Sequence, residues 1–205
     1  MIRYAVLLSI AVALLAGCGG GSSDTAAEPA PVPPPPPTQA ATTEAATTEA
    51  APAETAASPV SCTEEEFPEQ GAEHFESLPP GFAYNSFPAT SGPHANQTVV
   101  WDIYVDPLPE FNLVHNLEHG GVVVQFGEEV SADDVEALFE WYVPSPNGLI
   151  MAPHPELGDK IAATAWQHLL TCDGFDEAAL TAFRDSYRFN GPEKIPAEFL
   201  APGNS

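Results

Sequence analysis

Two short polar motifs frame the part of the chain that decides the fold: Thr90-Ser91-Gly92-Pro93-His94 and His115-Asn116-Leu117-Glu118-His119-Gly120-Gly121. Apolar residues precede the second motif and the run Val122-Val123-Val124 follows it, which predicts a short helix that leads into a buried strand. The glycine pair suits a left-handed helix end. Imidazoles and a carboxylate beside a core lose hydration unless they have partners. The pattern therefore predicts a functional site at this junction.

The spacing of the histidines predicts a metal site. On a helix, His115 and His119 share one face because they are four residues apart. Two imidazoles at this spacing form a ready chelate, and His94, on a turn stiffened by proline, would supply a third ligand for zinc or copper. We expect His94, His115 and His119 to be the metal ligands. The residues expected to surround them are His74, Glu118 and Ser91.

Other interpretations of these residues stay open. The pattern His115-x-x-Glu118-His119 matches the inverted zinc-protease motif, whose glutamate is a general base, although such enzymes continue in a long helix. Ser91 could instead be the nucleophile of a Ser/His hydrolase. In a third interpretation the histidines only bond to nearby backbone, and the domain is a non-catalytic interaction module. Met151 bears on metal identity, because a thioether beside imidazoles favours copper(I).

The first 18 residues have the pattern of an export signal. Arg3 precedes an apolar run, Ala5 to Ala16, of about a dozen residues, fewer than the roughly 20 that a membrane-spanning helix needs. The ending Leu15-Ala16-Gly17-Cys18 resembles the bacterial lipobox, in which the cysteine is lipidated (palmitate) and becomes the new N-terminus. We expect residues 1–17 to be a lipoprotein signal peptide, and the lipid on Cys18 to anchor the chain at the extracytoplasmic face of the cell membrane.

Composition divides the remaining chain in two. Residues 18–59 consist mainly of Gly, Ser, Ala, Thr, Glu and Pro, with five consecutive prolines at 33–37 and no aromatic residue. Such a segment buries too little apolar surface to offset the entropy of ordering, which predicts a disordered tether. Residues 60–205 are long enough for one globular domain with a single core.

The charge of the chain excludes some partners. The net charge is -24 at pH 7, and loss of Arg3 with the signal peptide would make it one unit more negative. A surface this acidic repels phosphate backbones and anionic lipid heads, so we expect no nucleic-acid binding and no membrane contact apart from the lipid. The same charge attracts cations. Protein partners are not indicated by any pattern in the sequence.

The cysteines predict one disulfide. With Cys18 lipidated, Cys62 and Cys172 are the two that remain in a chain bound for an oxidising compartment. Two free thiols or a thiolate metal ligand are the alternatives. A bond between them would tie the start of the domain to its last third.

Alternating patterns predict an α+β domain. We expect strands at residues 98–105, 122–126, 149–152 and 160–166. We expect helices at residues 110–119, at 132–143 after an N-cap at Ser131, and from 177 to about 190 after an N-cap at Asp176. The stretch between Cys62 and His94 is proline-rich and is expected to be irregular. Because the first connections are short, a small, mostly antiparallel sheet with about three helices is favoured over a doubly wound parallel sheet.

Several of these features together resemble a known family. The motif at residues 90–94, Tyr104, the motif Val114 to Gly120, and the pair Ala165-Trp166 resemble the bacterial domain of unknown function 3105 family over roughly residues 70–193. The resemblance implies that His74 is the histidine that this family tends to carry in its lead-in. Phe87-Pro88-Ala89 stands where a double proline would be expected before the first motif. The resemblance implies a fold and no particular reaction.

Overall fold

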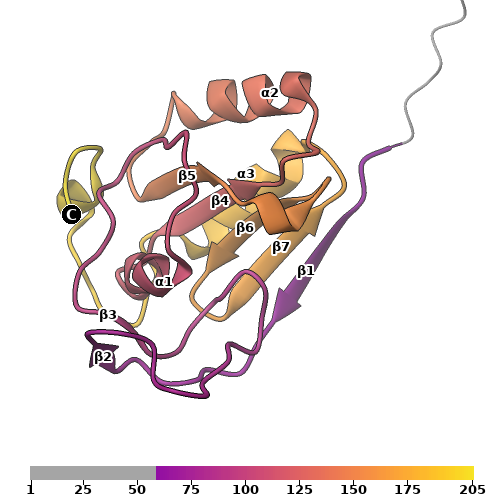
Figure 1. Ribbon diagram of the computed structural model, residues 1–205. Coiled ribbons are helices and arrows are strands. Elements are labelled where there is room, and N and C mark those ends of the chain that lie inside the picture. Colours follow the sequence, from indigo (N-terminus) through magenta and orange to yellow (C-terminus); the bar gives the residue numbers. More distant parts are fainter. Residues whose placement is uncertain (1–58) are drawn as a thin grey trace, which may run out of the picture. The chain divides into compact units, whose positions relative to one another are not determined.

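The computed structural model describes residues 59–205 (Figure 1). The predicted signal peptide at 1–17, the lipidation site Cys18 and the tether up to residue 58 lie outside these residues. The strands are β1 (Cys62–Glu66), β2 (His74–Phe75), β3 (His94–Ala95), β4 (Val122–Phe126), β5 (Leu149–Pro153), β6 (Ile161–Ala165) and β7 (His168–Cys172). The α-helices are α1 (Glu110–Glu118), α2 (Ala132–Tyr142) and α3 (Glu177–Tyr187), and two short 3-10 helices cover Pro155–Leu157 and Ala197–Leu200.

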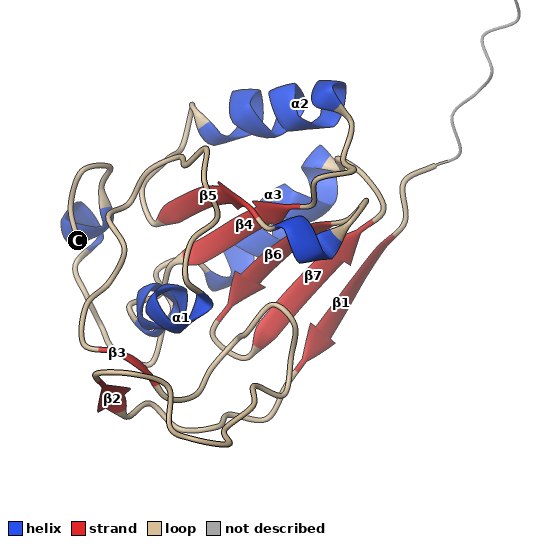
Figure 2. Cartoon of the chain, viewed as in Figure 1, coloured by secondary structure: helices blue, strands red, loops and turns tan. Residues whose placement is uncertain are grey.

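A five-stranded sheet in the order β1-β7-β6-β4-β5 forms the centre of the domain (Figure 2). Its neighbouring strands are antiparallel except β4 and β5, which are parallel. A separate pair, β2 and β3, is parallel. The domain is therefore α+β with a mostly antiparallel sheet and three α-helices, as the sequence predicts.

Helices cover both faces of this sheet, and the alternation of side chains along β4 shows how. Val122 and Val124 belong to one apolar cluster with Leu138 of α2 and Phe183 of α3. Val123 points to the opposite face, into a second cluster with α1 and the segment around Trp101. Figure 1 accordingly shows α1 and α3 on opposite sides of the sheet. A strand buried on both faces needs a continuous apolar run, and β4 supplies it.

Local signals placed the helices correctly. The Ser131 side chain accepts a hydrogen bond from the Asp134 backbone N–H at the start of α2. Asp176 caps α3 in the same way, through the Ala179 N–H. Side-chain caps satisfy N–H groups that have no partner within a helix, so these residue types mark helix starts reliably.

The predicted strand at 98–105 is wrong. Its backbone groups bond to a side chain and to the C-terminal segment: the Asn116 amide holds both the N–H and the carbonyl of Val99 at 2.8 Å, and Trp101 N–H donates to the Asn204 carbonyl at 2.9 Å. Among the described residues, the segment makes one isolated parallel bridge, from Ile103 to Met151. The β-branched residues at 98–105 therefore belong to a segment that does not pair with a neighbouring strand along its length.

The sequence analysis also missed two strands at one edge of the sheet. β1 was expected to be irregular, and it escapes detection because most of it is exposed and acidic. β7 follows β6 through a two-residue turn, in which Gln167 takes a left-handed conformation (φ 68°) without the usual glycine or asparagine signal.

The predicted disulfide is present at this edge. Cys62 and Cys172 are register partners in β1 and β7, and their sulfur atoms are 2.05 Å apart. The bond ties an exposed edge strand to the interior of the sheet.

Within residues 59–205, no helix combines the length and the hydropathy needed to span a bilayer.

Candidate metal centre

Four of the six histidines of the chain lie around the C-terminal half of α1, and two of them come from the β2–β3 pair. His74 and His94 are direct register partners in this pair, which places their side chains next to each other on one face. The pairing is held by a hydrogen bond from the His94 N–H to the Glu73 carbonyl, 3.1 Å. The lead-in segment therefore delivers one imidazole and the 90–94 motif the other.

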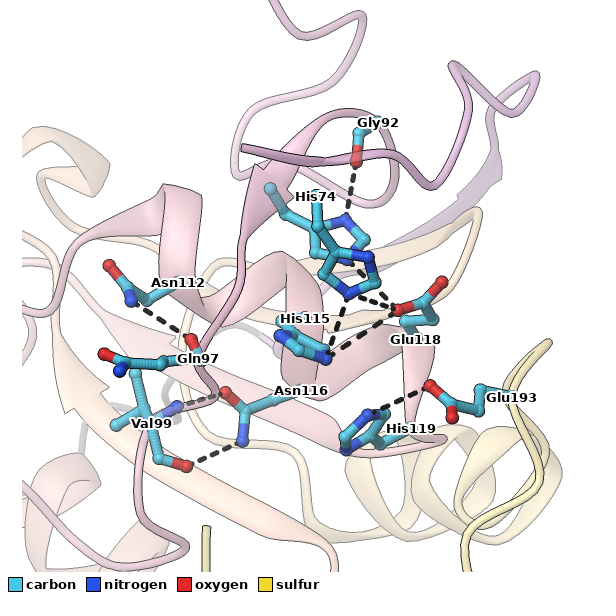
Figure 3. A network of polar contacts seen from close by, with 11 residues as sticks. His74, Gly92, Gln97, Val99, Asn112, His115, Asn116, Glu118, His119 and Glu193 are labelled. Atoms are coloured by element: carbon cyan, nitrogen blue, oxygen red, sulfur yellow. Dashed lines mark hydrogen bonds and ion pairs between the residues drawn. The ribbon is translucent and has the colours of Figure 1, made fainter. Parts of the chain in front are cut away.

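Helix α1 presents two more groups to the same point. His115 and Glu118 are three residues apart and lie on one face of the helix. The Nε2 atoms of His74 and His115 are 3.3 Å apart, and the Glu118 Oε2 lies 3.4 Å and 3.9 Å from them, respectively (Figure 3). The His94 Nε2 is 3.1 Å from the same oxygen. One ligand atom from each of the four residues thus lies within 4.8 Å of all the others.

The turn of the first motif fixes the orientation of His94. Its Nδ1 donates to the Gly92 carbonyl at 2.8 Å, so in the neutral ring the Nε2 carries the lone pair. The turn itself is held by Tyr84, whose hydroxyl donates to the Pro93 carbonyl at 2.9 Å. Ser91 accepts a hydrogen bond from the Gln70 N–H at 3.2 Å. The hydroxyl of Ser91 therefore has a structural role in the turn.

This orientation leaves two hydrogen-bond acceptors facing each other. The lone pair of the His94 Nε2 points at the Glu118 carboxylate oxygen, 3.1 Å away. Both side chains are buried, with 0% and 9% of their surface exposed. Two acceptors at this distance repel unless a proton or a metal cation lies between them. Metal-binding histidines commonly donate their second N–H to a backbone carbonyl in the way that His94 does.

Burial keeps His115 in the form that binds metal. Its pKa is lowered to about 4, chiefly by desolvation and also by His119, His94 and His74, while a hydrogen bond to the Ala95 backbone acts in the opposite direction. The imidazole is therefore neutral at pH 7, with a lone pair for coordination. Burial also lowers the pKa of His119, against the opposing effect of Glu193 and Glu118.

The three histidines that meet at Glu118 differ from the three predicted metal ligands in one residue. His94 and His115 meet as expected, but the third imidazole is His74, which the sequence analysis placed around the ligands. His119 is the C-cap of α1, and its ring packs against that of His115, with centroids 4.5 Å apart. Its Nε2 lies 3.1 Å from Glu193, a residue that no sequence pattern singled out.

His119 belongs instead to a second group of four residues. One ligand atom each from His115, Glu118, His119 and Glu193 lies within 4.8 Å of the others. The two groups share His115 and Glu118. The predicted set His94, His115 and His119 thus spans both groups, with His115 as its common member.

The other two histidines of the chain and Met151 lie elsewhere. His154 packs edge-on against Phe87, with ring centroids 5.0 Å apart, and His168 stacks on Tyr187 at 4.0 Å. Met151 is 3% exposed and packs in the apolar cluster on the sheet face opposite α1. The thioether is therefore not a ligand of this centre, and the donor atoms are three imidazole nitrogens and a carboxylate oxygen.

The comparison with family models agrees with the resemblance seen in the sequence. Residues 79–198, more than half of the chain, match the family described as "Protein of unknown function (DUF3105)", and the chain belongs to this family. The matched region contains every residue of the two groups except His74. Neither the curated proteins nor the solved structures contain a match to the chain.

Proposed function

We propose that this domain binds a divalent metal ion and is carried as a lipoprotein on the extracytoplasmic face of the cell membrane. The observation that carries the metal assignment is the convergence of three imidazole nitrogens and one carboxylate oxygen within 4.8 Å. If these side chains only stabilised the fold through hydrogen bonds, each of the four would be expected to bond to a nearby backbone group. Here the Nε2 atoms of His74 and His115 face each other at 3.3 Å.

The spacing of the four atoms suits a tetrahedral metal ion. Ligands at 2.0–2.1 Å from a tetrahedral metal are separated by about 3.3–3.4 Å. The separations of Glu118 from the three imidazoles and of His74 from His115 lie between 3.1 and 3.9 Å, and the other two are at most 4.8 Å, so small side-chain adjustments would accommodate the ion. Imidazole and carboxylate donors suit zinc and copper(II), whereas copper(I) prefers the sulfur ligands that this group lacks.

Charge supports the same proposal. The Glu118 carboxylate is 9% exposed, and a buried carboxylate requires a compensating positive charge. His115 has a lowered pKa and is neutral at pH 7. A bound cation would offset the carboxylate and replace the repulsion between the acceptor atoms with coordination bonds.

The number of ligands favours binding over catalysis at this position. Catalytic zinc usually has three protein ligands and an open position for water, whereas four protein ligands are typical of a closed site. The Ser91 hydroxyl accepts from the Gln70 backbone, which supports a turn-forming role over that of a nucleophile. We therefore propose a metal-binding or metal-sensing module and assign no hydrolase activity to this group.

The membrane assignment rests on the sequence. The lipobox-like residues 15–18 and the tether of residues 18–59 support anchoring through a lipid on Cys18. Intact mass of the protein isolated from its native membrane tests this directly. We expect a mature N-terminus at Cys18 with the added mass of the acyl chains, and an unmodified cysteine or another N-terminus would contradict the proposal.

Total metal analysis tests the metal assignment. The protein is purified without a His-tag, stripped with chelator, loaded with zinc and desalted, and its metal content is measured by mass spectrometry. We expect the wild type to retain zinc and His115→Ala to lose most of it. The matched control is His168→Ala, which removes a histidine outside both groups and should retain wild-type zinc. A wild type that retains no zinc would overturn the assignment.

A further inference from the structure

Beside the first group of ligands, His119 and Glu193 form a pair that is partly exposed. Their side chains are 19% and 51% exposed, whereas those of the first group range from 0% for His94 to 39% for His74. The His119 ring packs against His115, with ring centroids 4.5 Å apart and an interplanar angle of 73°. Figure 3 shows this pair on the side of His115 away from His74. The pair therefore adjoins the first group without taking part in it.

Backbone contacts position Glu193 beside the end of α1. The Glu193 N–H donates to the Glu118 carbonyl at 3.1 Å, and the Phe189 N–H donates to the Gly120 carbonyl at 2.7 Å. Gly191 lies so close to the Glu118 carbonyl and the Gly120 nitrogen that a Cβ atom there would overlap both. The loop after α3 is thus locked against the helix end, and its carboxylate is delivered to a defined place.

The two carboxylates of this second group have no basic partner in the described part of the chain. Lys160 pairs with Asp159 and Asp173. Arg184 and Arg188 both contact Asp185, and Lys194 donates to the Asn190 side chain. Glu118 and Glu193 therefore lie near each other with only imidazoles between them. Two like charges at this separation favour a cation in the same space.

We propose that His119, Glu193 and Glu118 hold a second divalent metal ion, so that the centre is dinuclear with Glu118 as the bridging ligand. The proposal rests on the proposed function, because Glu118 also serves the first ion. Its Oε2 faces His74 and His94, and a carboxylate oxygen of Glu118 also lies within 4.8 Å of ligand atoms of His119 and Glu193. Metal ions that share a carboxylate lie about 3.5–4 Å apart.

The second ion would differ from the first in its number of protein ligands. His119, Glu193 and the Glu118 oxygen supply three protein ligands, which leaves at least one coordination position for water or a small anion. A nitrogen and two carboxylate oxygens suit zinc and manganese(II). Because Glu193 is half exposed, that open position faces solvent.

Metal titration of the metal-free protein tests the proposal. We expect wild type to bind two equivalents of zinc per chain, and His119→Ala and Glu193→Gln to bind one, with the affinity of the first equivalent changed less than about threefold. With manganese(II), electron paramagnetic resonance of the fully loaded wild type should show a spin-coupled pair, and both variants should show an isolated ion. The matched control is Glu198→Gln, an exposed carboxylate on the same C-terminal segment, which should bind two equivalents.

The other outcomes separate the two proposals. If wild type binds one equivalent and His119→Ala weakens it more than tenfold, His119 is a ligand of a single ion and the dinuclear centre is refuted. If wild type binds one equivalent and neither variant changes it, His119 and Glu193 form only an ion pair, which also refutes it. A wild type that binds no metal overturns the proposed function as well.

Discussion

Replacing His74 by alanine should strongly weaken metal binding by the first group of ligands while leaving the fold intact. The side chain is 39% exposed and lies on a two-residue strand at the edge of the domain, so its loss should change the free energy of unfolding of the metal-free protein by less than about 0.5 kcal/mol. His94 is less suitable for this test, because it is fully buried and its removal would leave a cavity.

The size of the effect follows from the number of ligands. Four-ligand zinc sites bind with an apparent free energy of about 10–16 kcal/mol, or roughly 3 kcal/mol per ligand, so losing one should weaken binding about 100-fold. With zinc at about 100 times the wild-type dissociation constant, the ion should stabilise the wild type by about 2.7 kcal/mol and His74→Ala by about 0.4 kcal/mol. For a domain of this length, the shift in Tm should be about 8 °C against about 1 °C.

Thermal unfolding with and without zinc measures this difference, and competition with a chromophoric chelator gives the affinities. His168→Ala is the matched control, since it removes a partly buried histidine that stacks on Tyr187, away from the centre. A zinc-dependent rise in Tm of His74→Ala equal to that of the wild type would refute the convergence argument. So would a loss of zinc stabilisation in the control variant.

Three further predictions concern stability. Because the pKa of His115 is about 4 when folded and about 6.5 when unfolded, the unfolded chain binds the extra proton between these values. Through His115, the free energy of unfolding of the metal-free protein should therefore fall by about 3 kcal/mol as the pH falls from 6.5 to 4. Urea unfolding of His115→Gln over the same pH range should lack this contribution. Asn116→Ala leaves the Val99 N–H and carbonyl without their partner and should lower the free energy of unfolding, measured in urea, by about 2 kcal/mol. The control Asn112→Ala loses one exposed hydrogen bond and should lower it by less than about 0.5 kcal/mol. Equal losses in the two variants would contradict the role of Asn116. Reducing the disulfide opens a loop with a sequence separation of 110 residues and should lower stability by about 2–5 kcal/mol; free thiols found in the unreduced protein would contradict this pairing.

Tertiary structure decided which groups meet at the candidate centre. The i, i+4 spacing of His115 and His119 correctly predicted a shared face, since their ring centroids are 4.5 Å apart. The spacing could not show that the His119 Nε2 lies 3.1 Å from Glu193, which is 74 residues later and is placed by a hydrogen bond to the end of α1. His74 joins the first group because β2 pairs with β3. A two-residue strand pair has no periodicity that a sequence pattern could reveal.

The sequence by itself determined the features that depend on neighbouring residues. The caps Ser131 and Asp176, the apolar run of β4 and the site motif at the end of α1 are local, because a helix start or a buried strand is set by residues a few positions apart. The extended segment at 98–105 was misjudged because its partners are the Asn116 side chain and the chain end. Pairing between distant segments depends on which surfaces remain to be buried once the core has formed. That is a property of the folded chain as a whole, and the same condition brings Glu193 to the candidate metal centre.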